Sequence, residues 1–455
     1  MEDETSSSEP LLARVEAQCS TPNGNGFHAI DEHNNVEEEE AKSGFLKTLF
    51  NAVNILCGVG LLATPYAAAQ MGWASLLLLV VLGLMFLYTA KLLGRCMADA
   101  SWILTYPDIG EHAFGRRGRL LISIMLYSEL YITAVDFLIM EGQNLSAIAP
   151  AFVPFGGALG SARQAWVIIA ALIMLPTVYF RNMGLLAYLS AAGVLTSLSL
   201  TCLVGTIAAE HGFEHTELPF LKPRGLPLAI GLLSFNYGGH SVFPSLYTSM
   251  KNPRQYFRVL DWTFAIVIAL YATMTVLGYL AYGETVQDNI TLTAQERDPH
   301  AISTHIASWV TIVLPFAKYA LLMMPIAAAI EEKVPATTTR SASYAKLLSS
   351  EAGKRSWRDK AQALTTSLAI RTALVASTVA VALSVPQFAY VTALGGALFG
   401  LTVCVCIPAV AFLKITRGKI GRVEQAFALC MAVIGAALSL IGTIQAVLKI
   451  VAGAV

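Results

Sequence analysis

Charged residues are scarce in this sequence: Asp, Glu, Lys and Arg make up 13% of its 455 residues, against about 25% in a typical soluble domain. Hydrophobic residues account for 55%. A soluble fold of this length could not bury so much apolar surface, because the area exposed to solvent still grows with size. The composition therefore excludes an ordinary soluble protein and predicts an all-α protein whose solvent is lipid.

The sequence also lacks net charge, paired cysteines and clustered metal ligands. Its 30 basic and 30 acidic residues cancel, so no global field attracts nucleic acid. None of the 7 cysteines forms a CxxC pair, and most lie in apolar runs, where they act as small hydrophobic residues. No His/Asp, Ser/His or metal-ligand set lies in the apolar segments. We therefore expect no enzymatic activity, no metal and no cofactor.

The first 43 residues differ from the rest because they are polar and acidic, with four glutamates in a row at 37–40. They lack the pattern of a cleavable signal. Such a segment cannot bury enough apolar surface to order itself, so we expect a disordered cytosolic tail over 1–43. Within it, Glu9-Pro10-Leu11-Leu12 resembles an acidic dileucine signal for sorting to endosome-derived or vacuolar membranes, although four residues also match by chance.

Eleven apolar segments follow, each long enough to cross a bilayer, which takes about 20 residues. They lie at 45–70, 74–98, 119–147, 165–181, 184–208, 226–249, 259–282, 303–330, 367–386, 389–413 and 424–447. Together they form a predicted transmembrane domain over 44–447, with its longest cytosolic loop at 333–366 and a short lumenal C-terminus at 448–455.

The distribution of Lys and Arg predicts the orientation of these segments. Basic residues concentrate in the loops after even-numbered segments, as at Arg116, Arg117 and Arg119. The opposite side holds only Arg163, Lys222, Arg224, Arg297 and Lys449. The positive-inside rule therefore makes the N-terminus cytosolic. Two glycosylation sequons, at Asn144 and Asn289, fall on the opposite side. Asn289 is the better candidate because Asn144 is close to the membrane, although so short a sequon also occurs by chance.

The first segment contains helix-breaking residues at mid-membrane depth, Gly58 and Gly60 followed by Pro65. Glycine tolerates non-helical angles, and proline removes a donor and clashes with the carbonyl four residues earlier. The freed backbone groups cannot face lipid, so they must face protein or a polar cavity. A glycine pair alone indicates tight helix packing, but the polar neighbours Asn54 and Thr64 favour a binding site.

The sixth segment repeats the pattern, with Gly238 and Gly239 followed by Pro244. Segments 1 and 6 begin the two halves of a five-plus-five arrangement, and paired interrupted segments indicate a transporter site. A broken helix offers N–H groups and a positive dipole end to a carboxylate, and carbonyls to an ammonium. The two breaks therefore suit a zwitterion.

Ionisable side chains within apolar segments are costly and indicate function by default. Asp136 lies deep in the third segment, seven residues after Glu129 and on the same helix face, and is either functional or satisfied by a structural hydrogen bond. His240 either titrates in the range of about pH 5–8 or stays neutral and hydrogen-bonded. Lys318 is too deep to snorkel, so it needs an anion, a cage of carbonyls or a proton-linked role. Tyr131 either binds substrate or packs.

Four stretches of the sequence resemble the amino acid/auxin permease family. They are NILCGVGLLATP at 54–65, YPDIGEHAFG at 106–115, LYSEL at 126–130 and FNYGGHSVFP at 235–244. The resemblance covers about residues 44–447 and is closest to plant and yeast vacuolar amino acid transporters, with the vesicular inhibitory amino acid transporters as relatives. It implies eleven transmembrane helices, a LeuT-type inverted repeat with broken helices 1 and 6, and proton-linked movement of amino acids.

The residues and the resemblance together predict a monomeric, proton-coupled transporter of neutral amino acids in a vacuolar or vesicular membrane, working as a proton/amino acid antiporter. An amino acid sensor and a carrier of GABA-like or auxin-like substrates remain alternatives. We expect Lys318 and Asp136 to carry proton coupling. The expected substrate-binding residues are Asn54, Cys57, Gly58, Gly60, Thr64, Tyr131, Ser234, Asn236, Gly238 and His240.

Overall fold

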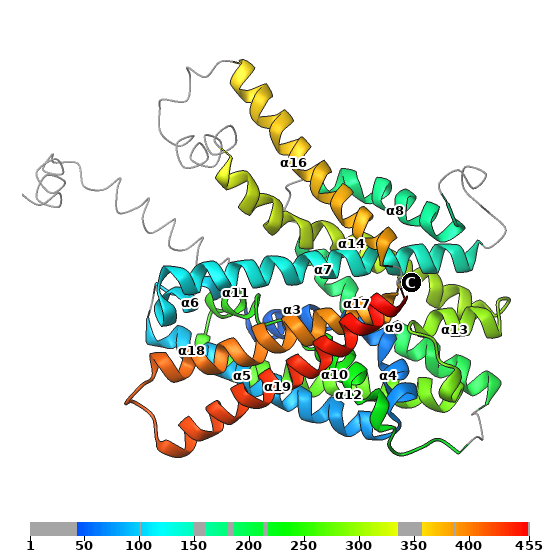
Figure 1. Cartoon of the computed structure of the whole chain (residues 1–455), viewed down its shortest axis with the longest axis horizontal. Coiled ribbons are helices and arrows are strands. Elements are labelled where there is room, and N and C mark those ends of the chain that lie inside the picture. The colour runs from blue at the N-terminus through cyan, green and yellow to red at the C-terminus, as the bar shows by residue number, and fades with distance from the viewer. Residues whose placement is uncertain are drawn as a thin grey trace, which may run out of the picture.

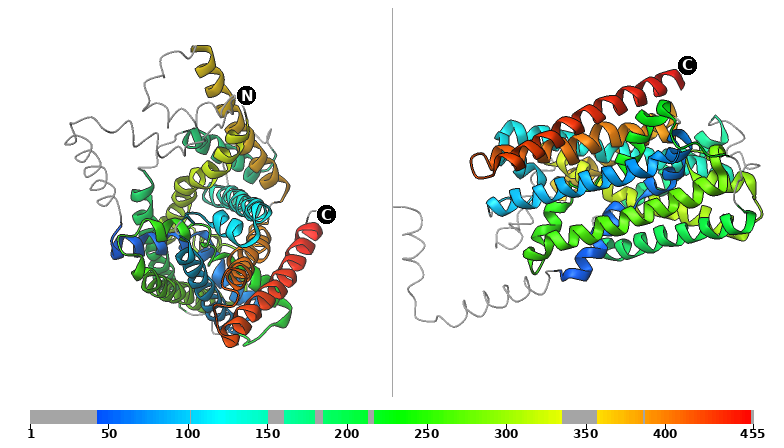
Figure 2. Two further views of the ribbon diagram at one scale, coloured as in Figure 1. Left: turned by 90° about the vertical axis from the view of Figure 1, so that its left-hand side faces the viewer. Right: turned by 90° about the horizontal axis from the view of Figure 1, so that it is seen from below.

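The computed structural model describes residues 43–100, 102–149, 160–179, 185–212, 217–334, 357–385 and 387–453. Within these ranges the regular secondary structure is helical apart from an isolated bridge between Ser43 and Met250, which confirms the predicted all-α class. Most of the long helices run side by side along one axis (Figures 1 and 2). The predicted tail, except for Ser43, and most of the 333–366 loop lie outside the described ranges.

The long helices follow the predicted apolar segments. They are α5 (Ala74–Asp99), α7 (Arg116–Ile148), α8 (Ala162–Tyr179), α9 (Leu185–His211), α12 (Tyr256–Tyr282), α14 (Ile302–Lys333), α16 (Trp357–Ser384) and α19 (Arg422–Gly453). Among the described residues, eight helices are long and apolar enough to cross a membrane, or nine with the bent pair of segment 1. The predicted count of eleven additionally needs α9 and the interrupted segment 6, and it stays a prediction.

Segments 1 and 6 are both interrupted where the glycines predict. Segment 1 consists of α3 (Phe45–Leu56), the 3₁₀ turn η1 (Val59–Ala63) and α4 (Thr64–Met71), with a bend of 49°. Segment 6 consists of α10 (Leu226–Phe235) and α11 (Phe243–Thr248). Pro65 and Pro244 lie in the first turns of α4 and α11, where a missing N–H leaves no hydrogen bond unmade.

Segment 10 contains two π-helical stretches that the sequence does not predict. Between α17 (Phe388–Leu394) and α18 (Ile407–Ile415), the backbone forms the π-helical stretches η7 (Gly395–Gly400) and η8 (Thr402–Cys406). In η7, a Cβ on Gly396 would lie 2.0 Å from the carbonyl oxygen of Gly231 in α10. The glycine therefore lets segment 10 contact the backbone of segment 6 just before its break, and π-turns are frequent at functional sites.

The YPDIGEHAFG motif forms the short helix α6 (Tyr106–Phe114), with a capping box between Thr105 and Asp108 and an end at Gly115, where φ is +71°. Two boundaries differ from expectation. Residues from Trp357 onward are already part of α16, so the loop that begins at 333 turns helical earlier than predicted. Residues 448–453 continue α19, because the apolar run extends to Gly453.

The two sequon asparagines are both buried and bond each other. Asn289 caps α13 (Ile290–Arg297), a helix that the sequence did not predict, and its Nδ2 donates to Asn144 Oδ1 at 2.8 Å. Both side chains are shielded from solvent. The expectation that Asn289 is the better glycan acceptor is therefore wrong for this fold, because its amide nitrogen joins α13 to α7 inside the protein.

The two ends of the bundle differ in charge. One end, at the left of Figure 1, carries α6, α11 and the turn between α18 and α19, and the other carries α13. Exposed basic side chains gather at the first of these, including Arg116, Arg119, Arg254, Arg258 and Arg417. We call the first the basic end and the second the far end.

Candidate functional site

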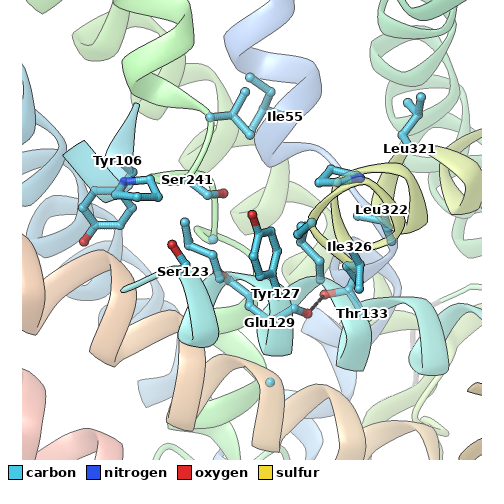
Figure 3. A pocket seen from close by; sticks show the side chains of 18 of the residues that line it. Ile55, Tyr106, Ser123, Tyr127, Glu129, Thr133, Ser241, Leu321, Leu322 and Ile326 are labelled. Atoms are coloured by element: carbon cyan, nitrogen blue, oxygen red, sulfur yellow. Dashed lines mark hydrogen bonds between the residues drawn. The ribbon is translucent and has the colours of Figure 1, made fainter. Parts of the chain in front are cut away.

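A cavity of about 1390 Å³ extends from the two helix breaks to the basic end. Its walls come from the broken segments, from α6 (Tyr106–Phe114), α7, α12 and α14, and from η7. At the mouth it reaches the exposed side chains of Arg116, Glu332 and Lys333. Figure 3 shows its lining, with Tyr127 and Glu129 of α7 facing Ile55 and Ser241 of the broken segments. None of the described lining residues belongs to α13, which lies at the far end, so the cavity as described does not reach that end.

The end of α3 forms one wall of the cavity, and Lys318 of α14 binds it. The Lys318 Nζ donates to the carbonyl of Cys57 at 2.8 Å and lies 3.4 Å from that of Asn54. A helix C-terminus leaves carbonyls without partners and carries partial negative charge, so an ammonium stabilises it. Of the roles expected for Lys318, the structure therefore shows a cage of carbonyls, at the break itself.

The two breaks meet at Asn236, which follows α10. Its side chain is buried, and neither its Oδ1 nor its Nδ2 has a hydrogen-bond partner among the described residues. A Cβ on Gly60 would lie 2.0 Å from Asn236 Oδ1, so only glycine permits this approach. Asn54 Oδ1 is likewise buried without a partner. Buried amides are nearly always hydrogen-bonded, and groups of this kind at a cavity wall suit a polar ligand.

Glu129 of α7 lies across from the break in segment 6. One of its carboxylate oxygens is 3.2 Å from the position that a Cβ on Gly238 would take. The other acidic residues of the described lining, Glu111 and Glu332, lie toward the mouth. From the sequence, Glu129 was noted only because it shares a helix face with Asp136. Its place in the LYSEL motif at 126–130 was a signal that it could line the site.

Tyr271 of α12 joins the two breaks, and no sequence pattern predicts this role. Its hydroxyl lies 2.5 Å from the carbonyl oxygen of Leu56, the last residue of α3, and 3.4 Å from that of Asn236. The side chain is fully buried from bulk solvent and lines the cavity. Because a hydroxyl has one hydrogen to donate, Tyr271 fixes one carbonyl and leaves the other available.

Six of the predicted residues line the cavity: Asn54, Gly58, Gly60, Asn236, Gly238 and Lys318. Three other predicted residues point elsewhere. Thr64 Oγ1 donates to the carbonyl of Leu61 in its own turn, and Tyr131 donates to Ser377 of α16. His240 is buried against α5, with Nε2 at 3.1 Å from the Phe86 carbonyl. Of the two alternatives given for His240, the hydrogen-bonded histidine therefore fits this structure.

The last three predicted residues lie behind the lining. Cys57 takes part through its backbone carbonyl, while its side chain is buried. Ser234 is buried two residues before Asn236. Asp136 faces α17, where Thr392 Oγ1 lies 2.9 and 2.8 Å from its two carboxylate oxygens. Of the alternatives weighed for Asp136, this contact is the structural hydrogen bond, and the residue does not touch the cavity.

Sequence comparison shows the family to which this chain belongs. The family profile described as "Transmembrane amino acid transporter protein" matches residues 41–448. The chain belongs to this family. It is therefore a multi-pass membrane protein and an amino acid transporter, which is a non-enzymatic function.

Plant members of the family match along most of their length. The amino acid transporter AVT1C of Arabidopsis thaliana is 38% identical, over 98% of this chain and 76% of its own. AVT1I of the same plant is 36% identical, over 90% of this chain and 96% of its own. A vesicular inhibitory amino acid transporter of Xenopus tropicalis is 23% identical, over 87% of this chain and 75% of its own. The resemblance stated from the motifs is thus confirmed.

A solved structure shows the same fold. The crystal structure of MhsT in complex with L-phenylalanine aligns with a TM-score of 0.51 at 11% sequence identity, covering 88% of this chain and 98% of that chain. At so low an identity the likeness concerns the fold alone. It supports the LeuT-type plan with broken helices 1 and 6 that the transporter family implies.

Proposed function

We propose that this family member exchanges lumenal protons for cytosolic neutral amino acids across a vacuolar or vesicular membrane. The observation that carries the proposal is the cavity at the two breaks, where backbone groups, the unpartnered Asn236 amide and Glu129 surround one space. An α-carboxylate fits the N–H groups at the start of η1, because a helical N-terminus attracts an anion. An α-ammonium fits the carbonyl end of α10 or the Glu129 carboxylate.

The charges beside the breaks favour a neutral side chain on the substrate. Lys318 is the basic residue of the described lining nearest the breaks, and the Asn54 and Cys57 carbonyls already hold its amine. An acidic substrate would bring a second carboxylate without a free cation to receive it. The remaining lining there is small or apolar, as at Gly58 and Gly238, which supports transport of neutral amino acids.

The charge distribution predicts the orientation of the protein in the membrane, and a pH difference across that membrane supplies the driving force. If the basic end is cytosolic, as the positive-inside rule predicts, the described cavity faces the cytosol. Each unit of pH difference across the membrane then supplies about 1.4 kcal/mol per proton, enough for a tenfold concentration ratio. An acidic lumen can therefore drive accumulation of substrate through exchange.

Lys318 and Asp136 are the proposed coupling residues. A protonated Lys318 gives charge-assisted hydrogen bonds to two carbonyls of α3, and loss of the proton weakens both. An ionised Asp136 accepts from Thr392, whereas a protonated one donates to it. Lys318→Met should flatten the pH dependence of transport while the protein still folds. An unchanged pH profile would remove Lys318 from the coupling mechanism.

Uptake into proteoliposomes tests the transport proposal directly. A panel of neutral, acidic, basic and inhibitory amino acids should be offered with a pH gradient imposed in either direction. We expect gradient-dependent, saturable uptake of neutral amino acids and counterflow without a gradient. Transport independent of any proton gradient would contradict coupling, and binding without flux would indicate a sensor.

A further inference from the structure

A second cavity lies at the basic end, apart from the transport cavity. It has a volume of about 440 Å³ and sits between the last turn of α18 and the first two turns of α19. It is lined by Leu413, Arg417, Arg422, Gln425, Ala426 and Leu429. The lining thus combines two guanidinium groups and an amide with three apolar side chains.

The two arginines differ from the neighbouring basic residues in having no partner. Lys419 Nζ lies 2.8 Å from Asp99, and Arg95 pairs with Glu424. Lys414 stacks 4.8 Å from the centre of the Phe114 ring. In the described ranges, by contrast, neither Arg417 nor Arg422 has an ion pair or a side-chain hydrogen bond, and both are exposed. Among the described residues, Lys419 and Arg95 therefore have acidic partners and Lys414 has an aromatic one, whereas the two arginines that line the cavity have none.

The chemistry of the cavity matches a phosphate that is joined to an apolar chain. Guanidinium groups present planar forks of donors that bind phosphate oxygens bidentately. Leu429 is 55% exposed, and Val433 and Leu440 continue the same face of α19 at 61% and 62% exposure. This face runs away from the basic end along the surface of the bundle, as α19 does in Figure 1. An acyl chain could follow it from a headgroup held at the arginines.

We propose that this cavity binds the phosphate group of an anionic phospholipid from the leaflet at the basic end. Basic pockets between transmembrane helices suit such headgroups, and anionic lipids are concentrated in the cytosolic leaflet. The bound lipid would bridge α18 and α19. Through the Lys419–Asp99 and Arg95–Glu424 pairs, the same turn is attached to the end of α5, so occupancy should stabilise this end of the bundle.

Thermal unfolding of the purified full chain in detergent tests the site. Phosphatidylserine mixed into phosphatidylcholine should raise the unfolding midpoint, whereas phosphatidylcholine alone should not. The double variant Arg417→Ala, Arg422→Ala should need about tenfold more anionic lipid for the same rise. Arg254→Ala, Arg258→Ala is the matched control, because it removes two exposed charges from the basic end outside this cavity. Native mass spectrometry should show retained lipid on the control and its loss from the first variant.

Two results would overturn the proposal. Equal loss of the lipid effect in both double variants would indicate unspecific attraction to the basic end. Stabilisation of the unmodified chain by inorganic phosphate, equal to that by lipid and abolished in the Arg417, Arg422 variant, would assign the cavity to a soluble phosphate. Because both arginines are exposed and unpaired, the lipid-free midpoint should be the same in all three proteins.

Discussion

Gly60 and Asn236 approach so closely that one added methyl group decides how the two breaks meet. A Cβ at position 60 would lie 2.0 Å from Asn236 Oδ1 and 3.0 Å from Phe235 Cδ1, whereas ordinary contacts begin at 3.4 Å. In Gly60→Ala the amide must therefore retreat by about 1.4 Å, and overpacking of this kind costs about 1–3 kcal/mol.

The free energy of overpacking in Gly60→Ala should weaken substrate binding more than it destabilises the folded protein. Among the described residues, the Asn236 side chain has no hydrogen-bond partner that its movement would lose, so it can rotate away while the helices stay in place. If substrate binds this amide, a loss of 1–3 kcal/mol corresponds to a decrease in affinity of about 5- to 150-fold. The unfolding midpoint of Gly60→Ala should change little.

Initial rates of uptake into proteoliposomes, measured against substrate concentration, give the assay. Gly205→Ala is the matched control, because the atom nearest to a Cβ at that position, Leu277 Cδ1, lies at an ordinary contact distance of 3.4 Å and Gly205 of α9 does not line the cavity. Its KM should stay within about threefold of the unmodified protein. In an Asn236→Ala background, Gly60→Ala should cause no further loss, since double-mutant cycles isolate the contact. Equal damage by both glycine substitutions, or a full further loss in that background, would refute the reasoning.

Two further predictions address groups around the site. Tyr271→Phe removes the hydroxyl that binds the Leu56 carbonyl, and because such a bond contributes about 0.5–1.5 kcal/mol, KM should rise two- to tenfold. Tyr256→Phe, at an equally buried α12 hydroxyl without a partner, should leave KM unchanged. Burial raises the pKa of Asp288 above its ordinary 3.8, against the opposing hydrogen bond from the Ala389 N–H. A raised carboxyl pKa costs folding stability as pH climbs through it, so the unfolding midpoint should fall as pH rises above 3.8, and less so in Asp288→Asn. If the unfolding midpoint of Asp288→Asn falls equally with pH, Asp288 is not a source of the pH dependence of stability.

The helices and their interruptions were predictable because their signals are local. Long apolar runs set the positions of the long helices, and the Gly–Pro pairs at Gly58 to Pro65 and Gly238 to Pro244 set the two breaks. The wide turns of η7 were not predictable in the same way. They follow from the close contact of Gly396 with α10. A contact between segments that are distant in the sequence produces no periodic pattern in the sequence of either segment.

The membership of the site was only half predictable, because sequence does not say which face of a helix meets a cavity. Glu129 and Asp136 share one face of α7, yet Glu129 lines the cavity and Thr392 binds Asp136 further along. Tyr131, two residues after Glu129, faces α16 instead. Tyr271 lies in an ordinary apolar helix, and only the bend in segment 1 brings a carbonyl to its hydroxyl. Packing, rather than residue type, decided each of these cases.

The carbonyl end of α3 is where proton and substrate effects can be separated. Lys318 holds the carbonyls of Asn54 and Cys57, and Tyr271 holds that of Leu56 between them in sequence. The lysine can lose charge, whereas the tyrosine contributes a neutral hydroxyl. In the proposed mechanism, pH therefore acts on one of two attachments of the same half-helix. Substitution of Lys318 should change the pH profile, and substitution of Tyr271 should change KM at every pH by the same factor. A pH-dependent effect of Tyr271→Phe would mean that the two attachments act as one coupled unit.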